Sequence, residues 1–267
     1  MQAPDTRTPT FLVGFPRSGT TLLDTCLRGH SEIAVMEEIE IVAELAKDFP
    51  ELLEWSPANN LCNTQRRALQ AAYWRVADRY LDAKGPGVVI DKMPLNLLDV
   101  HLLHNIFPST KRVLALRHPM DCVLSCFMQN FKLNLPMATM LSTQTAAGLY
   151  DAGMQKFDQA AFTYGLQVHA HKYEALIDAQ IDSLRSLLSF LKLPWNSAVL
   201  DNVGQATARG RINTPSYAQV SQPLYSTSKE RWRRYQTELA PCKETLRPWI
   251  ERYDYETRNT PEHVDIE

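Results

Sequence analysis

The residues with the clearest chemical potential lie in one short loop, Gly14-Phe-Pro-Arg-Ser-Gly-Thr-Thr21. Gly14 and Gly19 have the spacing of a phosphate loop, Gly-x4-Gly-Lys-Ser/Thr, in which backbone N–H groups surround phosphates and the lysine neutralises them. Here Thr20 occupies the lysine position, and the positive charge lies inside the loop at Arg17. A nucleoside triphosphate with Mg²⁺ would lose a central charge contact. A phosphosulfate carries less terminal charge, so the loop suits that ligand better.

Two cationic segments follow predicted strands further along the chain. Lys92 comes directly after the strand Gly87–Ile90, where an ammonium group can stabilise an oxygen that gains charge as a group leaves. Arg117 follows the strand Arg112–Leu116, and Ser125 lies in the next predicted helix. An arginine and a serine so placed can converge on one anion through charge-assisted hydrogen bonds.

An acidic pair follows the short predicted strand Ile33–Val35. Glu37 and Glu38 could supply the base that an attacking hydroxyl requires, or they could simply open a helix, where acidic residues suit the dipole. Three histidines near these segments are expected to pack or to support the site from a second layer: His101, His104 and His118.

Strands that alternate with helices predict an α/β fold with a parallel sheet and helices on both faces. In such sheets ligands bind outside the carboxyl ends of the strands, where the polar segments lie. The predicted strands are Thr10–Gly14, Ile33–Val35, Gly87–Ile90, Arg112–Leu116 and one near Leu166–His171. The predicted helices are Thr20–Leu27, Leu95–Ile106, Pro119–Asn130, Met137–Lys156, Asp178–Leu193, Ser228–Glu238 and Glu244–Arg252, with interrupted helical pattern over Ile39–Lys84.

The first loop resembles a known family. Pro16-Arg-Ser-Gly-Thr-Thr-Leu22 is similar to the 5′-phosphosulfate loop of sulfotransferases that use 3′-phosphoadenosine 5′-phosphosulfate (PAPS). The resemblance is strongest to tyrosylprotein sulfotransferases and to the bacterial, TPR-associated enzymes similar to them. It implies a P-loop-containing three-layer α/β/α fold. It also implies that the loop binds the donor through Arg17, Ser18, Gly19, Thr20 and Thr21.

The resemblance also gives roles to the other strand ends. Arg117 and Ser125 match the residues that hold the 3′-phosphate, although Gln129 replaces a further arginine expected there. Lys92 matches the lysine of a Lys-x-Pro element and becomes the residue that stabilises the leaving group.

The acidic pair matches a Gly-Glu-Glu segment of the tyrosylprotein enzymes. Its second glutamate, which supplies the catalytic base, corresponds to Glu38, while Met36 replaces the glycine. Many other sulfotransferases use a histidine instead, so the base assignment has an alternative.

Three more matches lie in the last third of the chain. His171-Lys-Tyr-Glu-Ala-Leu176 resembles a strand end whose tyrosine, here Tyr173, contacts the nucleotide. Ser216-Tyr-Ala-Gln-Val220 resembles a loop motif that makes Ser216 a donor to the sulfonate or its bridging oxygen. Arg231 falls where a lysine binds phosphate, and arginine keeps that charge.

Composition limits the remaining functions. The formal net charge of −2 over 267 residues gives no global basic field, which argues against a nucleic-acid binder. The apolar runs are too short to cross a membrane, and the N-terminus lacks the pattern of a signal peptide. Five cysteines at irregular spacings predict no disulfide framework and a cytoplasmic location. Cys122 and Cys126 could form half of a metal site, but buried thiols are favoured and no metal is expected.

These observations predict one domain over residues 10–258, with a helical insertion at about 39–84 and tails at 1–9 and 259–267. The implied activity is transfer of sulfonate from PAPS to an acceptor hydroxyl, with 3′,5′-phosphoadenosine (PAP) as the product. The acceptor is a peptide tyrosine, or a small-molecule or carbohydrate hydroxyl. The insertion and the polar segment Gln205–Gln222, expected to be a loop, would shape its cleft. A P-loop kinase and a non-catalytic nucleotide-binding module remain as rivals, and the sequence does not indicate an oligomeric state.

Overall fold

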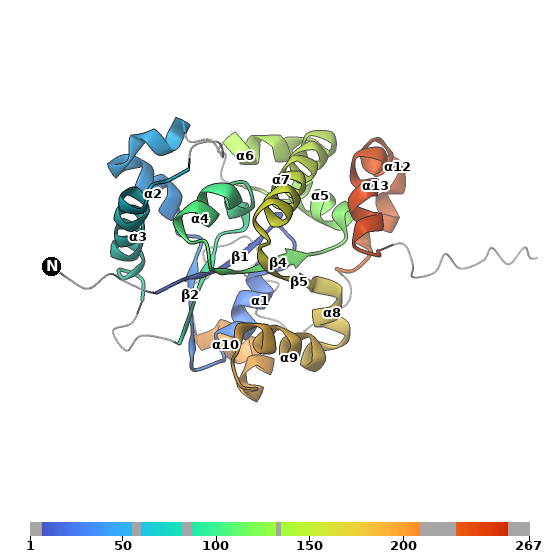
Figure 1. Cartoon of the computed structure of the whole chain (residues 1–267). Coiled ribbons are helices and arrows are strands. Elements are labelled where there is room, and N and C mark those ends of the chain that lie inside the picture. Colours follow the sequence, from blue (N-terminus) through green and yellow to red (C-terminus); the bar gives the residue numbers. More distant parts are fainter. Residues whose placement is uncertain (1–6, 55–59, 82–86, 132–134, 209–227, 256–267) are drawn as a thin grey trace, which may run out of the picture. The chain divides into compact units, whose positions relative to one another are not determined.

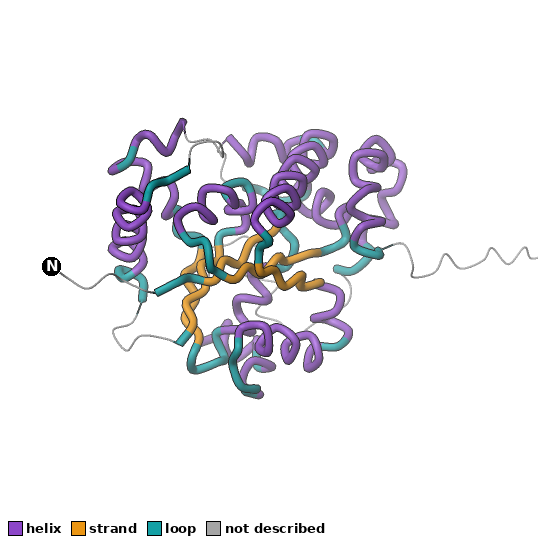
Figure 2. Tube along the Cα trace, viewed as in Figure 1, coloured by secondary structure: helices purple, strands orange, loops and turns teal. Residues whose placement is uncertain are grey.

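A five-stranded parallel sheet in the computed structural model confirms the predicted α/β class. The structure describes residues 7–54, 60–81, 87–131, 135–208 and 228–255. The strands are β1 (Thr10–Gly14), β2 (Ile33–Glu37), β3 (Val88–Lys92), β4 (Lys111–Leu116) and β5 (Gln167–Lys172). Their order across the sheet is β2-β3-β1-β4-β5, and they lie side by side as the orange band of Figure 2.

The strand order places β1 in the middle, between β3 and β4. Leu12 of β1 pairs with Lys92 of β3, and Gly14 pairs with Ala115 of β4. Because all strands are parallel, their carboxyl ends meet at one edge of the sheet. The loop after β1 therefore leaves the sheet between Lys92 and Arg117.

Helices cover both faces of this sheet in the first of two compact units, Met1–Arg117 with Gly153–Ser226. On one face lie α1 (Thr20–Leu27), α8 (Tyr173–Asp178), α9 (Gln180–Leu191) and α10 (Asn202–Ala208) (Figure 1). Leucines of α1, α8 and α9, together with Ala206 of α10, join Leu12, Ile90 and Val113 of the strands in one core cluster. Burial of this apolar surface is what holds helices and sheet together.

The opposite face carries α3 (Asn63–Ala77) and α4 (Val100–Ile106), with α2 (Ile41–Asp48) beside them (Figure 1). Phe11 of β1 meets Tyr73 and Phe107 there, with ring centroids 6.4 and 6.2 Å from it. Two short 3₁₀ helices, η1 (Pro50–Glu54) and η2 (Pro94–Leu97), connect these elements. Packing of these rings, edge-to-face for Phe11 with Tyr73 and tilted for Phe11 with Phe107, fills the second layer of the core.

The second compact unit is His118–Ala152 with Thr227–Glu267. Its described elements are α5 (Pro119–Phe127), α6 (Leu135–Ala138), η3 (Thr139–Leu141), the start of α7 (Thr143–Tyr164), η5 (Arg231–Tyr235), α12 (Gln236–Leu239), η6 (Ala240–Cys242) and α13 (Lys243–Arg252). Trp249 of α13 donates a hydrogen bond from Nε1 to Asp151 Oδ1 at 2.8 Å. The rest of α7, from Gly153, belongs to the first unit.

All five predicted strands exist, but several helix bounds differ from prediction. The helix predicted near Met137–Lys156 is three elements, of which α7 runs on to Tyr164. The one predicted over Asp178–Leu193 is α9, Gln180–Leu191, and the short helix α8 before it was not predicted. One helix was expected over Leu95–Ile106, where η2 precedes α4. The predicted loop Gln205–Gln222 is wrong at its start, because residues 205–208 belong to α10. Buried Ala206 holds that polar turn against the core. Residues 209–222 lie outside the described ranges.

Candidate functional site

The loop after β1 makes a sharp turn into α1. Arg17 and Gly19 both have left-handed backbone conformations, with φ of 71° and 94°. Ser18 N donates to Phe15 O at 3.1 Å, which closes the turn. Left-handed residues in such a turn give the concave backbone that binds anions, and α1 adds the positive end of its dipole from Thr20.

Both glycines of the motif are required because neighbouring atoms leave no room for a Cβ. A Cβ on Gly14 would lie 2.5 Å from Ala115 O, and one on Gly19 would lie 2.7 Å from Cδ2 of Tyr173. Gly19 also has a φ that side chains with a Cβ rarely adopt. The glycines therefore fix how closely the loop lies to β4 and to Tyr173.

The polar groups of the loop fit an anionic ligand. Ser18 is 2% exposed, and its Oγ has no hydrogen-bond partner among the residues that the structure describes. Thr20 and Thr21 are also buried. A buried hydroxyl costs free energy unless it is hydrogen-bonded, so a ligand oxygen that accepts its proton would complete the loop.

Lys92 ends β3 and is the centre of a buried charge cluster. Its side chain is fully buried, and Nζ lies 2.8 Å from Glu38 Oε1 and 3.2 Å from Glu37 Oε1. A third carboxylate oxygen, Asp24 Oδ2, lies at 3.8 Å. The cluster joins the ends of β2 and β3 with α1 and brings the predicted site residues Lys92 and Glu38 together.

Asp24 and Arg28 also belong to this cluster, and neither was predicted as a site residue from the sequence. Asp24 is fully buried, and its Oδ1 accepts a hydrogen bond from Arg28 Nε at 2.5 Å. Arg28 Nη2 donates to the backbone oxygen of Val35 in β2 at 2.9 Å. One signal was available, because Asp24 is the single charged residue of TTLLDTCL and lies four residues before Arg28.

The acidic pair does not open a helix. Glu37 is the last residue of β2, Glu38 follows with a left-handed φ of 52°, and α2 begins at Ile41. Glu38 N donates to Lys92 O at 2.8 Å, which fixes its backbone beside β3. Its side chain is 36% exposed, whereas Met36, which replaces the glycine of the family pattern, is buried. Glu38 thus reaches solvent from a fixed backbone.

Arg117 lies against the loop after β1. Its Nη1 donates to the backbone oxygen of Arg17 at 3.2 Å, and its guanidinium carbon lies 4.9 Å from the ring centroid of Tyr173. Tyr173, predicted at a strand end, is the first residue of α8. Arg17, Gly19, Arg117 and Tyr173 therefore form one group in the first unit.

Two other predicted donor-binding residues belong to the second unit. Ser125 lies in α5, as expected, and Arg231 begins η5. Beside Arg231, Trp232 N donates to Asp121 Oδ1 at 2.9 Å. Ser216 lies outside the described residues, so its role stays a prediction.

The histidines have packing roles within their units. His104 stacks on Tyr164 with centroids 4.0 Å apart, and burial lowers its pKa to about 4. His101 Nδ1 lies 3.3 Å from the Tyr164 hydroxyl. In the second unit His118 stacks on Trp232 at 4.7 Å. The expectation of packing roles agrees with these contacts.

Asp91 is the acidic strand-end residue that a Mg²⁺-dependent kinase would need. Its side chain points to the opposite face of β3 from that of Lys92, where the Tyr73 hydroxyl donates to Oδ2 at 2.8 Å. Burial raises the pKa of Asp91 to about 7. The carboxyl group is therefore built into the aromatic layer.

Cys122 and Cys126 are buried thiols, as the sequence favoured. In the described part of the chain, no three His, Cys, Asp or Glu residues are grouped so that they could hold a metal ion. Within the same ranges, none of the helices combines the length and apolar character needed to span a membrane.

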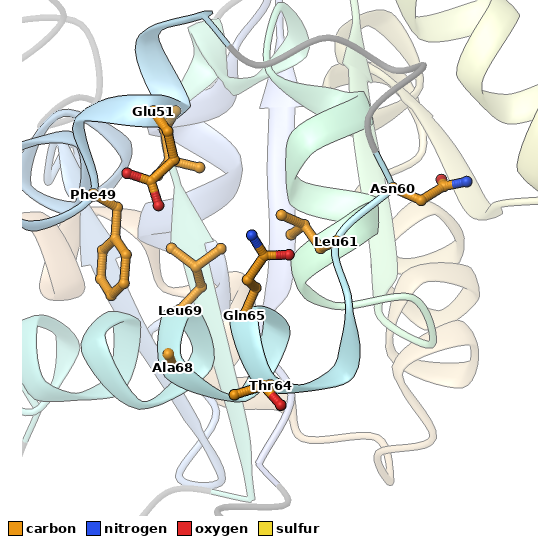
Figure 3. Close-up of a pocket in the computed structure, with 9 residues that line it drawn as sticks. Phe49, Glu51, Asn60, Leu61, Thr64, Gln65, Ala68 and Leu69 are labelled. Atoms are coloured by element: carbon orange, nitrogen blue, oxygen red, sulfur yellow. The ribbon is translucent and has the colours of Figure 1, made fainter.

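A pocket of about 360 Å³ lies in the helical insertion, between η1 and the start of α3 (Figure 3). Its lining residues are Phe49, Glu51, Leu52, Asn60, Leu61, Thr64, Gln65, Ala68 and Leu69. Gln65 also caps α3, because its Oε1 accepts from Cys62 N at 3.0 Å. Along the chain, α2 lies between Glu38 and Phe49, the first residue that lines the pocket.

Known proteins are similar to this chain in sequence and fold. Residues 9–197 match the sulfotransferase family. An uncharacterized protein of Aquifex aeolicus is 29% identical over 264 residues, which are 92% of this chain and 34% of that protein. Protein-tyrosine sulfotransferase 1 of Danio rerio is 23% identical over 233 residues, 83% of this chain and 64% of that one. The chain thus spans about a third of one relative and just under two thirds of the other.

Among solved structures, the sulfotransferase domain of the Synechococcus PCC 7002 olefin synthase has the same fold. Its TM-score is 0.61 at 19% identity, over 93% of this chain and 98% of that domain. The family match extends from the strand before the loop to beyond α9. Because it covers well over half of the chain, the protein belongs to the sulfotransferase family.

Proposed function

We propose that the protein transfers a sulfonate group from PAPS to an acceptor hydroxyl. The observation that carries the proposal is the position of Lys92. This fully buried residue ends β3, the strand beside β1, and its ammonium lies 2.8 Å from Glu38. This pair would supply a base for the acceptor and a cation for the leaving group.

The loop after β1 is proposed to bind the phosphosulfate end of the donor. Bound PAPS supplies an activated sulfonate joined through oxygen to a 5′-phosphate. Arg17 contributes positive charge, Ser18 offers its buried hydroxyl, and the first turn of α1 contributes backbone N–H groups with Thr20 and Thr21.

Glu38 and Lys92 divide the proton and charge transfer between them. Glu38 accepts the proton of the acceptor hydroxyl as that oxygen bonds to sulfur. Lys92 neutralises the electron pair left on the 5′-phosphate oxygen when the old sulfur–oxygen bond breaks. The resulting products are the sulfated acceptor and PAP, with the proton on Glu38.

Arg117 and Tyr173 are proposed to hold the nucleotide in the first unit, where they already contact each other. The roles of Ser125, Arg231 and Ser216 rest on the family resemblance alone. Ser125 and Arg231 would bind phosphate, and Ser216 would donate to the sulfonate. The predicted single domain and cytoplasmic location likewise remain predictions.

For the acceptor we propose a tyrosine hydroxyl of a protein or peptide. The similarity to the protein-tyrosine sulfotransferase of Danio rerio over 83% of the chain supports it. The pocket in the insertion is lined by residues that follow α2, the helix after Glu38, and it could bind neighbouring parts of an extended acceptor. Small-molecule and carbohydrate hydroxyls are the alternative acceptors.

The test is incubation of the purified protein with ³⁵S-labelled PAPS and a panel of tyrosine peptides, simple phenols and sugars. Label in the peptides that is absent from matched phenylalanine peptides is the expected result. Label confined to phenols or sugars would exclude the tyrosine acceptor and keep the sulfotransferase. Loss of labelling in Lys92→Met would link the activity to this site.

A thermal-shift comparison addresses the kinase rival. The protein should be stabilised by PAP and much less by ATP with Mg²⁺, because Thr20 replaces the lysine that a P-loop kinase has at this position. Stabilisation by ATP with Mg²⁺ alone would favour the kinase. Stabilisation by PAP without transfer to any acceptor would favour a binding module.

A further inference from the structure

Asp24 is a buried charge that the proposed reaction does not use. It lies in α1, four residues beyond Thr20, and every other residue of that helix is buried and uncharged. A carboxylate without solvent is costly unless cations compensate it. Arg28 and Lys92 are the cations placed to do so, with Arg28 Nε at 2.5 Å from Oδ1 and Lys92 Nζ at 3.8 Å from Oδ2.

The contacts of Asp24 form a continuous link across the site. Arg28 binds both Asp24 and the backbone of Val35 in β2, so it ties α1 to the strand that ends at Glu37. Lys92 is shared between Asp24 on one element and the two glutamates on another. The charges that face Lys92 are therefore Asp24 from α1 and the glutamate pair from the end of β2, while Arg28, the C-cap of α1, contacts Asp24.

Such an arrangement suits a lysine that must serve two partners. Paired with Glu38 alone, the ammonium would neutralise the base and be drawn away from the donor. A second carboxylate on α1, the helix that begins at the donor loop, gives the ammonium a counter-charge on the loop's own element. Hydrogen-bonded supporting groups of this kind orient the residues that act on substrate.

We propose that Asp24 is a positioning residue that acts through Lys92, holding its ammonium at the donor loop while Glu38 remains available as the base. The inference rests on the proposed function, since it assigns Asp24 to the same donor site. Arg28 fixes the orientation of Asp24 and supports it from the helix surface.

A double-mutant cycle on PAP affinity, measured by calorimetry, tests this link. Asp24→Asn should weaken PAP binding by roughly 10-fold, and Lys92→Met by roughly 10- to 100-fold, as expected for a lost charge-assisted contact. In the Lys92→Met background, Asp24→Asn should weaken PAP binding by less than about twofold more. Asp24→Glu, which keeps the charge, should bind PAP more tightly than Asp24→Asn does.

The matched control is Asp78→Asn, the same chemical change at an exposed ion pair with Arg7. It should leave PAP affinity unchanged. Equal and additive losses from Asp24→Asn with and without Lys92 would overturn the inference, because a purely structural role predicts them. Failure of the unsubstituted protein to bind PAP would instead count against the proposed function.

A further variant covers the case in which Asp24→Asn or Lys92→Met does not fold. Arg28→Gln keeps Asp24 but removes the cation that orients it, at a side chain that is 25% exposed. Arg28→Gln should weaken PAP binding by a few-fold. Asp24→Glu remains the variant that keeps the charge, and Asp78→Asn remains the control. Unchanged affinity in Arg28→Gln would contradict the positioning role.

Discussion

Lys92 Nζ and Glu38 Oε1 lie 2.8 Å apart, although their side chains come from different strand ends and differ in exposure. Lys92 is fully buried, whereas Glu38 is 36% exposed. The proposed leaving-group cation thus lies within the protein, and the proposed base lies at its surface, where an acceptor can arrive. This division separates the effects of substituting the two residues.

Glu38→Gln should lower kcat for sulfonate transfer by about 10²–10⁴-fold, because the amide cannot accept the acceptor proton. PAP affinity should change little, since Lys92 stays in place. Steady-state kinetics with a saturating donor and calorimetry with PAP measure the two quantities.

Glu37→Gln is the matched comparison, because Glu37 Oε1 is also within 3.2 Å of Lys92. It should cost much less activity than Glu38→Gln. Full turnover in Glu38→Gln, or a larger loss in Glu37→Gln, would reassign the base.

Gly19→Ala should both destabilise the first unit and weaken PAP binding. The left-handed φ of 94° costs a residue with a Cβ about 1–2 kcal/mol, and that Cβ would press on the Tyr173 ring at 2.7 Å. Thermal unfolding and PAP affinity should therefore fall together.

Gly148→Ala is the control for that change. Gly148 lies inside α7 and a Cβ there would meet nothing within 4 Å. Alanine should stabilise the helix by about 0.5–1 kcal/mol and leave PAP affinity unaltered. A Gly19→Ala protein as stable as this control, with normal PAP affinity, would argue against the tight loop.

Arg117→Ala should remove the preference for a nucleotide with a 3′-phosphate. The unsubstituted protein is expected to bind PAP more tightly than adenosine 5′-monophosphate, and a charged hydrogen bond accounts for roughly 10- to 100-fold of affinity. Calorimetry with both nucleotides gives the ratio. If both weaken equally, Arg117 acts through its contact with Arg17 O at the 5′ end instead.

The sheet and most of the site could be predicted from local sequence signals. The predicted strands end at Gly14, Val35, Ile90 and Leu116, and the structure extends the second to Glu37 and the third to Lys92. Parallel topology then brings the polar residues at these ends to one edge. The glycine spacing and Arg17 marked the loop directly.

Contacts between residues far apart in the chain could not be predicted in this way. Asp24 looks like an ordinary helix residue until α1 packs beside the end of β3, and only then does it face Lys92. The predicted start of the loop at Gln205 was wrong for a related reason. Burial of Ala206 keeps this segment helical despite the polar residues around it.

Asp91→Asn should change how stability depends on pH. Burial raises the pKa of Asp91 to about 7 from an ordinary value of 3.8, so the folded state favours the protonated form. Its contribution to stability is present below pH 4 and is lost as pH rises through about 7. Asparagine carries no charge, and its side-chain oxygen can still accept the hydrogen bond from the Tyr73 hydroxyl. The melting temperature of Asp91→Asn, minus that of the unsubstituted protein, should therefore rise between pH 4 and pH 8. Asp78→Asn, at an exposed ion pair, should show no such rise. A difference for Asp91→Asn that stays flat across this range would mean that folding does not raise the pKa of Asp91.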